Sequence, residues 1–279
     1  MDEIIVKSPA KINIGLNIIN KRDDGFHNLE TIFYPINLYD EIKFTKSDKF
    51  TFNSNDEKLS KDKTNLIIRT KELLENEFDI HIPVNIYLKK NIPIGAGLGG
   101  GSTNAASTLL ALTKLFNLEI SKIEMMDLAI KLGSDVPYFL NPVPSFAESR
   151  GENLFPINFR IKKYLLIVNP GIHIATKWAF SLITPKQPNI SLKSLIDKPK
   201  IEIEDVMNFA SNDFEETIFT HFPEIKKIKD KMLYFGANYS MMTGTGSTVW
   251  AMFDDEEAAY QAELFFKCKN YFTFIQAPI

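Results

Sequence analysis

The sequence predicts an α+β protein of two lobes, and three features of the chain lead to that prediction. The first ninety residues are rich in runs with the apolar–polar alternation of half-buried strands. A glycine-rich segment then joins a strand to a helix, and the second half of the chain alternates helices with strands. At 279 residues the chain is near the upper size for one hydrophobic core, which favours two lobes.

The strands of the first half are predicted from runs of apolar or alternating residues. The charged segment 20–27, which contains a glycine, is expected to form a turn or the tip of a long hairpin. A helix over residues 65–78 is indicated by its apolar spacing. The predicted strands are residues 4–6, 12–18, 41–45, 50–52 and 84–88.

Residues 93–103 read Pro-Ile-Gly-Ala-Gly-Leu-Gly-Gly-Gly-Ser-Thr and contain five glycines. A helix is predicted after them, because apolar residues recur at helical spacing from Ala105 to Phe116. Glycines let a backbone turn tightly and approach a ligand, and the free N–H groups of a helix start favour an anion. The segment therefore predicts a phosphate cradle, and a glycine-rich turn without a ligand is the alternative.

Other nucleotide-binding loops do not fit this segment. Gly95 to Gly100 formally match G-x-G-x-x-G, but a second helix rather than a parallel strand follows the first, so the dinucleotide-binding context fails. The sequence has no G-x-x-x-x-G-K-[ST] and no H-R-D or D-F-G motif. The absence of these motifs excludes the P-loop nucleoside triphosphatases (NTPases) and the protein kinases.

The next helix is predicted from a capping box formed by Ser121 and Glu124, and Gly133 ends it. Its expected buried stripe consists of Ile123, Met126, Ile130 and Leu132. The prolines within 141–144 break the chain, and the two lobes are expected to be residues 1–155 and 156–279.

In the second lobe, helices are expected to cover one face of a small antiparallel sheet, which makes an α+β sandwich. Residues 243–247 are predicted to form a turn between two of its strands. The predicted strands are residues 164–168, 239–242, 249–253 and 271–275, and the predicted helices are residues 203–219, 224–234 and 255–267.

The composition excludes several classes of function. A net charge of −3 argues against a broad nucleic-acid surface, and no apolar run approaches the length of a membrane span. The single cysteine fits a reducing compartment, and the four histidines lack metal-ligand spacing. We expect a cytoplasmic protein, a monomer or a homodimer, with a small-molecule substrate and neither a nucleic acid nor a membrane as its partner.

Three separated motifs resemble those of the GHMP kinases, a family named for galactokinase and the homoserine, mevalonate and phosphomevalonate kinases. They are Ser8 to Asn13, Pro93 to Ser102 and Met242 to Ser247. The resemblance implies a two-lobed GHMP kinase fold, in which a strand-rich N-terminal lobe carries the phosphate-binding glycine loop. It also implies a C-terminal ferredoxin-like α/β sandwich, and ATP and Mg²⁺ as cofactors.

Within the family, further residues resemble the members that phosphorylate a cytidine-diphosphate-linked methylerythritol in the non-mevalonate pathway of isoprenoid biosynthesis. These residues are Ala10 to Asn13, Asp23 to Thr31, Gly133 to Phe139 and Asn212 to Glu215. The implied reaction moves the γ-phosphate of ATP to the tertiary 2-hydroxyl. Homoserine-type or mevalonate-type kinases, and a non-catalytic regulator of the same fold, are the alternatives.

Two charged residues are the candidate catalytic pair. Asp135 follows a helix-ending Gly-Ser, where a side chain can project, although it could instead cap the next segment. Lys11 interrupts an apolar strand, which is costly unless its ammonium reaches a cleft or solvent; the alternative is an edge-strand lysine in water. The resemblance implies that Asp135 is the base and that Lys11 lies beside it and the reacting hydroxyl.

The resemblance also assigns residues to ATP. Asn65 matches a position near the adenine, and its alternative role is a helix N-cap. Ser102 or Thr103 is expected to help orient Mg²⁺, which phosphates and water would chiefly hold, so no side chain is assigned as a metal ligand. The expected ATP-binding residues are Pro93, Gly95, Gly97, Leu98, Gly99, Gly100, Gly101, Ser102, Thr103 and Asn65.

Recognition of the cytidine part is implied for two aromatic rings and a histidine. Phe26 stands where tyrosine is usual, so stacking is kept while a hydroxyl hydrogen bond is lost. Ser247 stands where alanine is common, and we expect little effect. Phe180 could instead be an ordinary core residue. The expected substrate-binding residues are Asn13, Phe26, His27, Phe180, Gly244 and Gly246.

Overall fold

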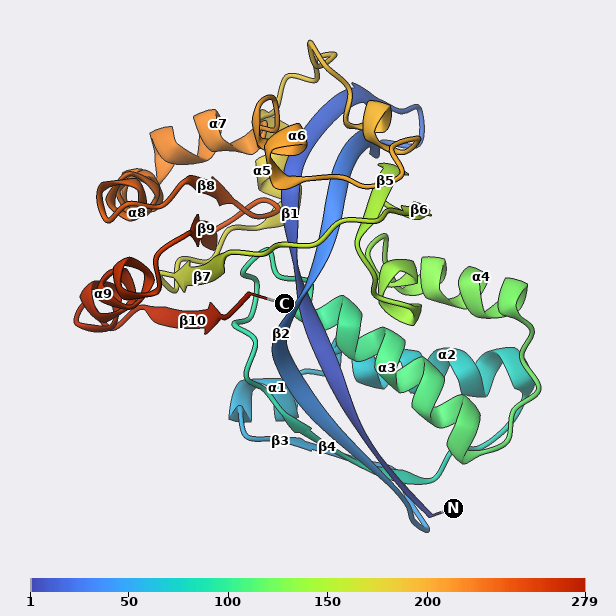
Figure 1. Ribbon diagram of the computed structural model, residues 1–279. Coiled ribbons are helices and arrows are strands. Elements are labelled where there is room, and N and C mark those ends of the chain that lie inside the picture. The colour runs from blue at the N-terminus through green and yellow to red at the C-terminus, as the bar shows by residue number, and fades with distance from the viewer. Residues whose placement is uncertain (1, 279) are drawn as a thin grey trace. The chain divides into compact units, whose positions relative to one another are not determined.

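The computed structural model describes residues 2–278, and its internal contacts divide the chain into two compact units (Figure 1). Unit 1 comprises Met1–Ala10, Asn37–Ile94 and Gly99–Pro142, and unit 2 comprises Lys11–Ile36, Gly95–Leu98 and Val143–Ile279. The chain thus passes between the units several times. Each unit is built from three separate segments, whereas the expected lobes were two continuous segments that meet near residue 155. The two lobes stay a prediction from the sequence.

The strands of unit 1 have the alternation that the sequence predicts. The last part of β2 (His27–Lys46) pairs antiparallel with β4 (Val84–Lys89), and β3 (Thr51–Ser54) pairs parallel with β4. Along β4, residues with buried side chains alternate with exposed ones. The strands expected at 41–45, 50–52 and 84–88 are therefore confirmed. The long strand β1 (Glu3–Lys21), which pairs with β2, contains both runs expected at 4–6 and 12–18.

The helices of unit 1 begin where their capping residues predict. The Asn65 Oδ1 atom accepts the Ile67 N–H at 2.9 Å, so Asn65 is the N-cap of its helix. Ser121 and Glu124 form the expected capping box. The helices are α1 (Glu57–Lys61), α2 (Leu66–Phe78), α3 (Gly100–Leu115) and α4 (Lys122–Leu132), followed by the 3₁₀ turn η1 (Pro137–Leu140).

The buried face of α4 differs from the expected one. Ile123 is 76% exposed, whereas Leu128, Ala129 and Leu132 are buried. Ile123 precedes Leu128 by five residues, which is about 140° around a helix, so the two side chains cannot share one face. The prediction for Ile123 is wrong because α4 packs through its C-terminal half against α2 and α3.

Unit 2 contains a four-stranded antiparallel sheet in the order β10 (Phe272–Gln276), β7 (Tyr164–Asn169), β9 (Val249–Phe253) and β8 (Tyr239–Met242). Two helices, α8 (Pro223–Tyr234) and α9 (Glu256–Lys267), pack on it. Apart from the helices inserted between β7 and α8, the chain order β7–α8–β8–β9–α9–β10 is that of a ferredoxin-like sandwich, which confirms the predicted fold of the second half.

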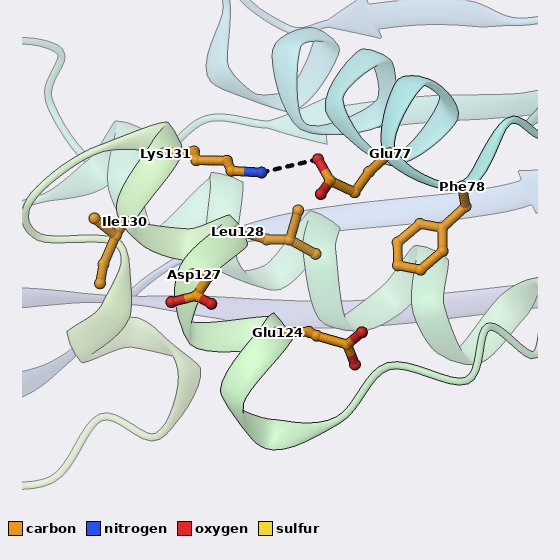
Figure 2. A pocket seen from close by; sticks show the side chains of 7 residues that line it. All are labelled: Glu77, Phe78, Glu124, Asp127, Leu128, Ile130 and Lys131. Carbon is orange, nitrogen blue, oxygen red and sulfur yellow. Dashed lines mark hydrogen bonds and ion pairs between the residues drawn. The ribbon is translucent and has the colours of Figure 1, made fainter.

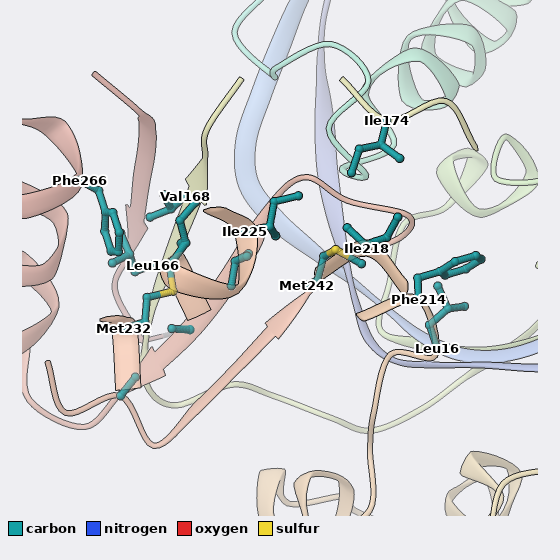
Figure 3. Packing of buried hydrophobic residues seen from close by; sticks show 14 of the residues in the cluster. Leu16, Leu166, Val168, Ile174, Phe214, Ile218, Ile225, Met232, Met242 and Phe266 are labelled. Carbon is teal, nitrogen blue, oxygen red and sulfur yellow. The ribbon is translucent and has the colours of Figure 1, made fainter. Parts of the chain in front are cut away.

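The core of unit 2 lies between this sheet and its helices, and Figure 3 shows it from close by. Leu166 and Val168 of β7 face Met232 of α8 and Phe266 of α9, and all four side chains are buried. The remaining elements of unit 2 are β5 (Ser145–Ser149), β6 (Asn153–Pro156), α5 (Thr176–Leu182), η2 (Leu192–Leu195), α6 (Ile203–Met207) and α7 (Phe214–His221).

The long helix expected over residues 203–219 is wrong, because α6 and α7 are separated by an irregular segment. In that segment the Ser211 carbonyl accepts the Leu16 N–H at 2.7 Å, and the Asp213 N–H donates to the Leu16 carbonyl at 2.9 Å. Pairing with β1 thus replaces helical hydrogen bonds at these positions. The helical apolar spacing continues through the segment, but tertiary contacts override it.

Within residues 2–278, no helix combines the length and the apolar character that a membrane crossing requires.

Candidate functional site

The glycine-rich segment has the conformation of an anion-binding loop. Gly95, Gly97 and Gly99 have φ values of 64°, 76° and 72°, in the left-handed region that favours glycine. Gly99 is the N-cap of α3 and makes no side-chain cap bond. The first N–H groups of α3 therefore lack both an intrahelical acceptor and a capping side chain, and the helix dipole favours an anion there.

Two polar atoms in the first half of α3 lack a protein partner. The Thr103 hydroxyl and the Asn104 side-chain oxygen are buried, and neither has a hydrogen-bond partner in the described chain. A buried polar group without a partner costs about 1–3 kcal/mol, so these atoms suit a site that a polar ligand completes. The start of α2 adjoins this helix, because a Cβ atom added at Gly101 would lie 3.5 Å from the Leu66 Cδ1 atom. Asn65, which precedes Leu66, is thus close to the loop.

Lys11 is buried rather than solvent-facing, which excludes the edge-strand alternative. It is 3% exposed, and its Nζ atom donates to the Asn13 Oδ1 atom at 2.6 Å. The ammonium also lies 5.0 Å from the centre of the Phe33 ring, a cation–π distance. A buried ammonium needs such partners, since removing a charge from water is costly.

The three sequence motifs meet inside unit 2. The Thr243 hydroxyl accepts the Asn13 N–H at 2.9 Å and lies 3.1 Å from the Gly97 carbonyl oxygen. The Asn13 Nδ2 group donates to Thr31 at 2.9 Å, and the Lys11 N–H donates to the Leu98 carbonyl at 3.0 Å. The first motif, the glycine loop and the third motif therefore share one hydrogen-bond network.

Asn212 holds the third motif in place. Its Nδ2 group donates to the carbonyl oxygens of Met242 and Gly244, at 2.8 and 2.9 Å. The Glu215 carboxylate accepts the Met242 N–H at 2.8 Å. Thr31, Thr243 and Asn212 have no predicted site role, although all three are polar residues inside the motifs quoted above.

The candidate cytidine-binding residues are partly brought together. The rings of His27 and Phe180 lie 5.1 Å apart at 31°. Phe180 also packs edge-on against the buried Phe214 at 4.9 Å, so it borders both His27 and the core. Phe26 is 49% exposed, and its ring faces Arg150, a residue that the sequence analysis did not identify.

The charge state of His27 follows from its surroundings. Burial lowers the pKa of the His27 imidazole, and the nearby Lys21 lowers it further. The ring is therefore neutral at pH 7, with one nitrogen that donates a hydrogen bond and one that accepts.

Asp135 lies in the turn between α4 and η1, is half-buried, and belongs to unit 1. The other candidate catalytic residue, Lys11, belongs to unit 2. Among residues 2–278 no group of three or more His, Cys, Asp or Glu side chains is arranged to hold a metal ion.

A pocket of about 450 Å³ lies in unit 1 beside α2 and α4 (Figure 2). The Lys131 ammonium pairs with the Glu77 carboxylate at 2.8 Å at its edge. The lining residues are Glu77, Phe78, Glu124, Asp127, Leu128, Ile130 and Lys131. Because no residue predicted for the site lines this pocket, it contributes nothing to the candidate chemistry.

Family models match both halves of the chain. Residues 65–141 match the N-terminal domain of the GHMP kinases, and residues 192–272 match the C-terminal domain of the same family.

The chain is also similar to individual relatives over most of its length. It is 42% identical to the 4-diphosphocytidyl-2-C-methyl-D-erythritol kinase of Bacteroides fragilis over 254 residues, which cover 89% of this chain and 91% of that protein. The enzyme of the same name from Chlorobium limicola is 38% identical and covers 99% of this chain and 97% of its own.

Solved structures agree with these similarities. A crystal structure of 4-(cytidine 5'-diphospho)-2C-methyl-D-erythritol kinase superposes with a TM-score of 0.81 at 28% identity, covering 98% of each chain. A homoserine kinase from Cytophaga hutchinsonii has a TM-score of 0.68 at 19% identity and covers 100% of this chain and 95% of its own, which shows a shared fold alone.

Proposed function

The chain belongs to the GHMP kinase family, and from that premise we propose that it phosphorylates the 2-hydroxyl of 4-(cytidine 5'-diphospho)-2-C-methyl-D-erythritol with ATP. The products are the 2-phosphate and ADP, in the methylerythritol phosphate pathway of isoprenoid biosynthesis. The observation that carries the proposal is the network of Lys11, Asn13, Gly97 and Thr243, because it joins all three kinase motifs. The relatives that match nearly the whole chain supply the substrate.

The glycine loop and the start of α3 bind the ATP phosphates in this proposal. The uncapped N–H groups that follow Gly99 donate to phosphate oxygens, and the buried Thr103 hydroxyl gains the partner it lacks in the protein. Asn65 contacts the nucleotide from the adjoining start of α2, and it can do so while capping that helix.

Mg²⁺ belongs to the proposal as the metal that accompanies ATP. When bound, it neutralises charge on the phosphates. The hydroxyls of Ser102 and Thr103 are the protein groups of the loop that suit a hard cation, and phosphate and water oxygens supply its other ligands.

The proposed chemistry rests on Asp135 and Lys11. Asp135 accepts the proton of the attacking hydroxyl, which is the role a carboxylate plays in phosphoryl transfer to an alcohol. The Lys11 ammonium, which Asn13 orients, favours the negative charge that develops on the hydroxyl oxygen.

Phe26, His27 and Phe180 bind the cytidine part in this proposal. The rings offer faces for stacking, and the neutral His27 imidazole can read the polar edge of a base. Gly244 and Gly246 have left-handed φ values of 57° and 91°, and Cβ atoms added there would lie 3.2 Å from the Gly97 Cα atom and 2.9 Å from the Met242 Sδ atom. In this proposal the two glycines therefore shape the turn of the third motif that faces the substrate. The small metabolic substrate and the single cysteine support our expectation of a cytoplasmic enzyme. A monomer or a homodimer stays our expectation for its assembly.

The test is ADP release with Mg-ATP and the cytidyl methylerythritol substrate, beside mevalonate and homoserine. Turnover of the first substrate alone is the expected result. Turnover of either of the others keeps the family but removes the assignment of Phe26, His27 and Phe180. Turnover of none would favour another small-molecule kinase or a non-catalytic regulator of the same fold.

A further inference from the structure

Two turns of unit 2 are fastened together by polar contacts. The turn between β1 and β2 carries Arg22, whose guanidinium donates to Asp24 at 3.1 Å and to Asn28 at 3.1 Å. The same guanidinium donates to the Ser149 hydroxyl at 3.0 Å, at the turn between β5 and β6. Phe26 sits inside the first turn, where its N–H donates to the Asp24 carboxylate at 3.1 Å. The backbone that carries Phe26 is therefore fixed.

The second turn places a guanidinium on the Phe26 ring. The Arg150 Cζ atom lies 4.6 Å from the ring centre, within cation–π range. Glu152 holds Arg150 in place, because it accepts the Arg150 N–H at 2.7 Å and lies 3.4 Å from the Arg150 Nε atom. The Ser149 hydroxyl donates to the same carboxylate at 3.1 Å, which ties the support of Arg150 to the support of Phe26.

Phe26 itself is unusual for a large apolar side chain. It is 49% exposed although its backbone and one side of its ring are held firmly. A ring that only filled the core would be covered, and a ring without a role would not need a fixed guanidinium beside it. The arrangement suits a flat partner that stacks on the exposed part of the ring, as a heteroaromatic base does.

We infer that Arg150 is a positioning residue for recognition of the pyrimidine base: it holds the Phe26 ring in the orientation on which the base stacks. This inference rests on the proposed function, since the cytidyl substrate supplies the base. The contrasting possibility is that Arg150 binds the diphosphate of the substrate directly. Glu152 already faces the Arg150 Nε atom and balances its charge, which favours action through the ring.

The test replaces Arg150 with methionine, which has similar length but no charge. We measure the dissociation constants of cytidine and of cytidine 5'-diphosphate by calorimetry, together with the kinetic constants. Loss of a partly exposed cation–π contact should weaken both ligands by the same factor, roughly 2- to 5-fold. The KM for the cytidyl substrate should rise by that factor, whereas kcat and the KM for ATP should not change. The melting temperature should fall only slightly, because one partly exposed ion pair and one ring contact are lost. Arg150→Lys, which keeps the charge, should recover part of the loss.

A double-mutant cycle with Phe26→Leu separates the two roles. If Arg150 acts through the ring, Arg150→Met causes no further loss in the Phe26→Leu background. A further loss there, a loss for cytidine 5'-diphosphate but not for cytidine, or unchanged binding of both ligands by Arg150→Met would each overturn the inference. So would absence of cytidine binding to the unsubstituted enzyme. Turnover by that enzyme is assayed separately: if it fails while cytidine binding still depends on Arg150, only the proposed reaction is lost.

Discussion

The glycine-rich segment is shared between the two units, and its individual glycines are needed for different reasons. In unit 2, a Cβ atom added at Gly97 would lie 2.3 Å from the Thr243 carbonyl oxygen, and one added at Gly95 would lie 2.6 Å from the His173 Nδ1 atom. Both residues also have a left-handed φ. At position 97 the protein itself requires glycine, because a backbone carbonyl occupies the place of a side chain. At position 95 the neighbour is a histidine side chain, and glycine is favoured chiefly by the left-handed φ.

In unit 1, Gly99 has a left-handed φ of 72° and a Cβ atom added at Gly100 would lie 2.8 Å from the Lys90 Nζ atom, but Gly101 is different. Gly101 is exposed in the first turn of α3, has no left-handed φ, and would place a Cβ atom at an ordinary 3.5 Å from Leu66. Nothing in the protein excludes alanine at this position. A run of glycines can therefore combine residues that packing requires with residues that leave space for a ligand. Only the atoms around each glycine distinguish the two kinds.

The largest effect is expected for Asp135 in unit 1, which we propose as the base of the reaction. Asp135→Asn should lower kcat by roughly 10²–10⁴-fold, or about 3–5 kcal/mol, because the proton acceptor is lost. ATP affinity and the melting temperature should stay nearly unchanged, since Asp135 is only half-buried. Steady-state kinetics with both substrates measure this effect.

Asp127→Asn is the matched control, an exposed aspartate on α4 of the same unit, and it should behave as the unsubstituted enzyme. Near-normal turnover by Asp135→Asn would remove this residue from the base role.

Gly97→Ala tests whether packing requires glycine at position 97. The added methyl group clashes with a backbone carbonyl, and alanine is strained at a left-handed φ. The free energy of unfolding should therefore fall by about 2–4 kcal/mol. Denaturant unfolding measures the loss, with Gly101→Ala as its matched control. Equal stability of the two variants would contradict the different roles that we assign to Gly97 and Gly101.

Phe180→Ala tests whether this aromatic ring of unit 2 binds the substrate or only packs in the core. The KM for the cytidyl substrate should rise roughly tenfold, about 1.4 kcal/mol, and more than the KM for ATP, because a stacking ring is worth about that much. Trp178→Ala removes another half-buried aromatic from α5 and should reduce stability without this selectivity. If Phe180→Ala changes both KM values equally, Phe180 is a core residue only.

Gly101→Ala tests whether ATP binding requires glycine at position 101. Alanine is the better helix former by about 0.5–1 kcal/mol, so the variant should be at least as stable as the unsubstituted enzyme. The KM for ATP should nevertheless rise several-fold, because the methyl group occupies space that we assign to the phosphates. An unchanged KM would mean that this glycine is not needed for the nucleotide.

The smallest effect concerns Glu75, at the far end of α2 from the glycine loop. Burial alone raises the pKa of this carboxyl, but hydrogen bonds from Lys71, at 2.5 Å, and the Ile82 N–H, at 2.8 Å, outweigh it and hold the pKa below its usual value of 4.5. A carboxyl with a lowered pKa in the folded state stabilises the fold above the unfolded-state pKa, and this contribution disappears as the pH falls through the lower folded-state value.

Glu75→Gln should therefore destabilise the protein by about 1 kcal/mol at pH 7. The difference should shrink as the pH falls below 4.5 and vanish once the pH is below the lower folded-state pKa. Thermal unfolding at several pH values measures it, and a difference independent of pH would contradict the charge-based explanation. ATP affinity should not change, which separates the stability of unit 1 from its loop.

Features that depend on near neighbours in the chain could be predicted. Asn65 and Ser121 begin their helices as expected, because a cap bonds only to the next few residues. The helix expected over 203–219 failed, since Leu16, almost two hundred residues away, takes its backbone hydrogen bonds at Ser211 and Asp213. Ile123 failed for a related reason: its spacing fitted a stripe, but the packing of α4 decides which face is buried.

The fold class, the three motifs and the residue types of the candidate site follow from local features of the chain, because they depend on periodicity, turns and caps. Contacts in the folded protein were needed to show that the buried Lys11 ammonium bonds to Asn13, that Gly97 must be glycine, and that Arg150 lies on the Phe26 ring. These facts come from contacts between residues far apart in the chain, such as Asn13 and Thr243, which are 230 positions apart. Local pattern does not encode which of many distant groups will meet, since that choice is made by the packing of the whole unit.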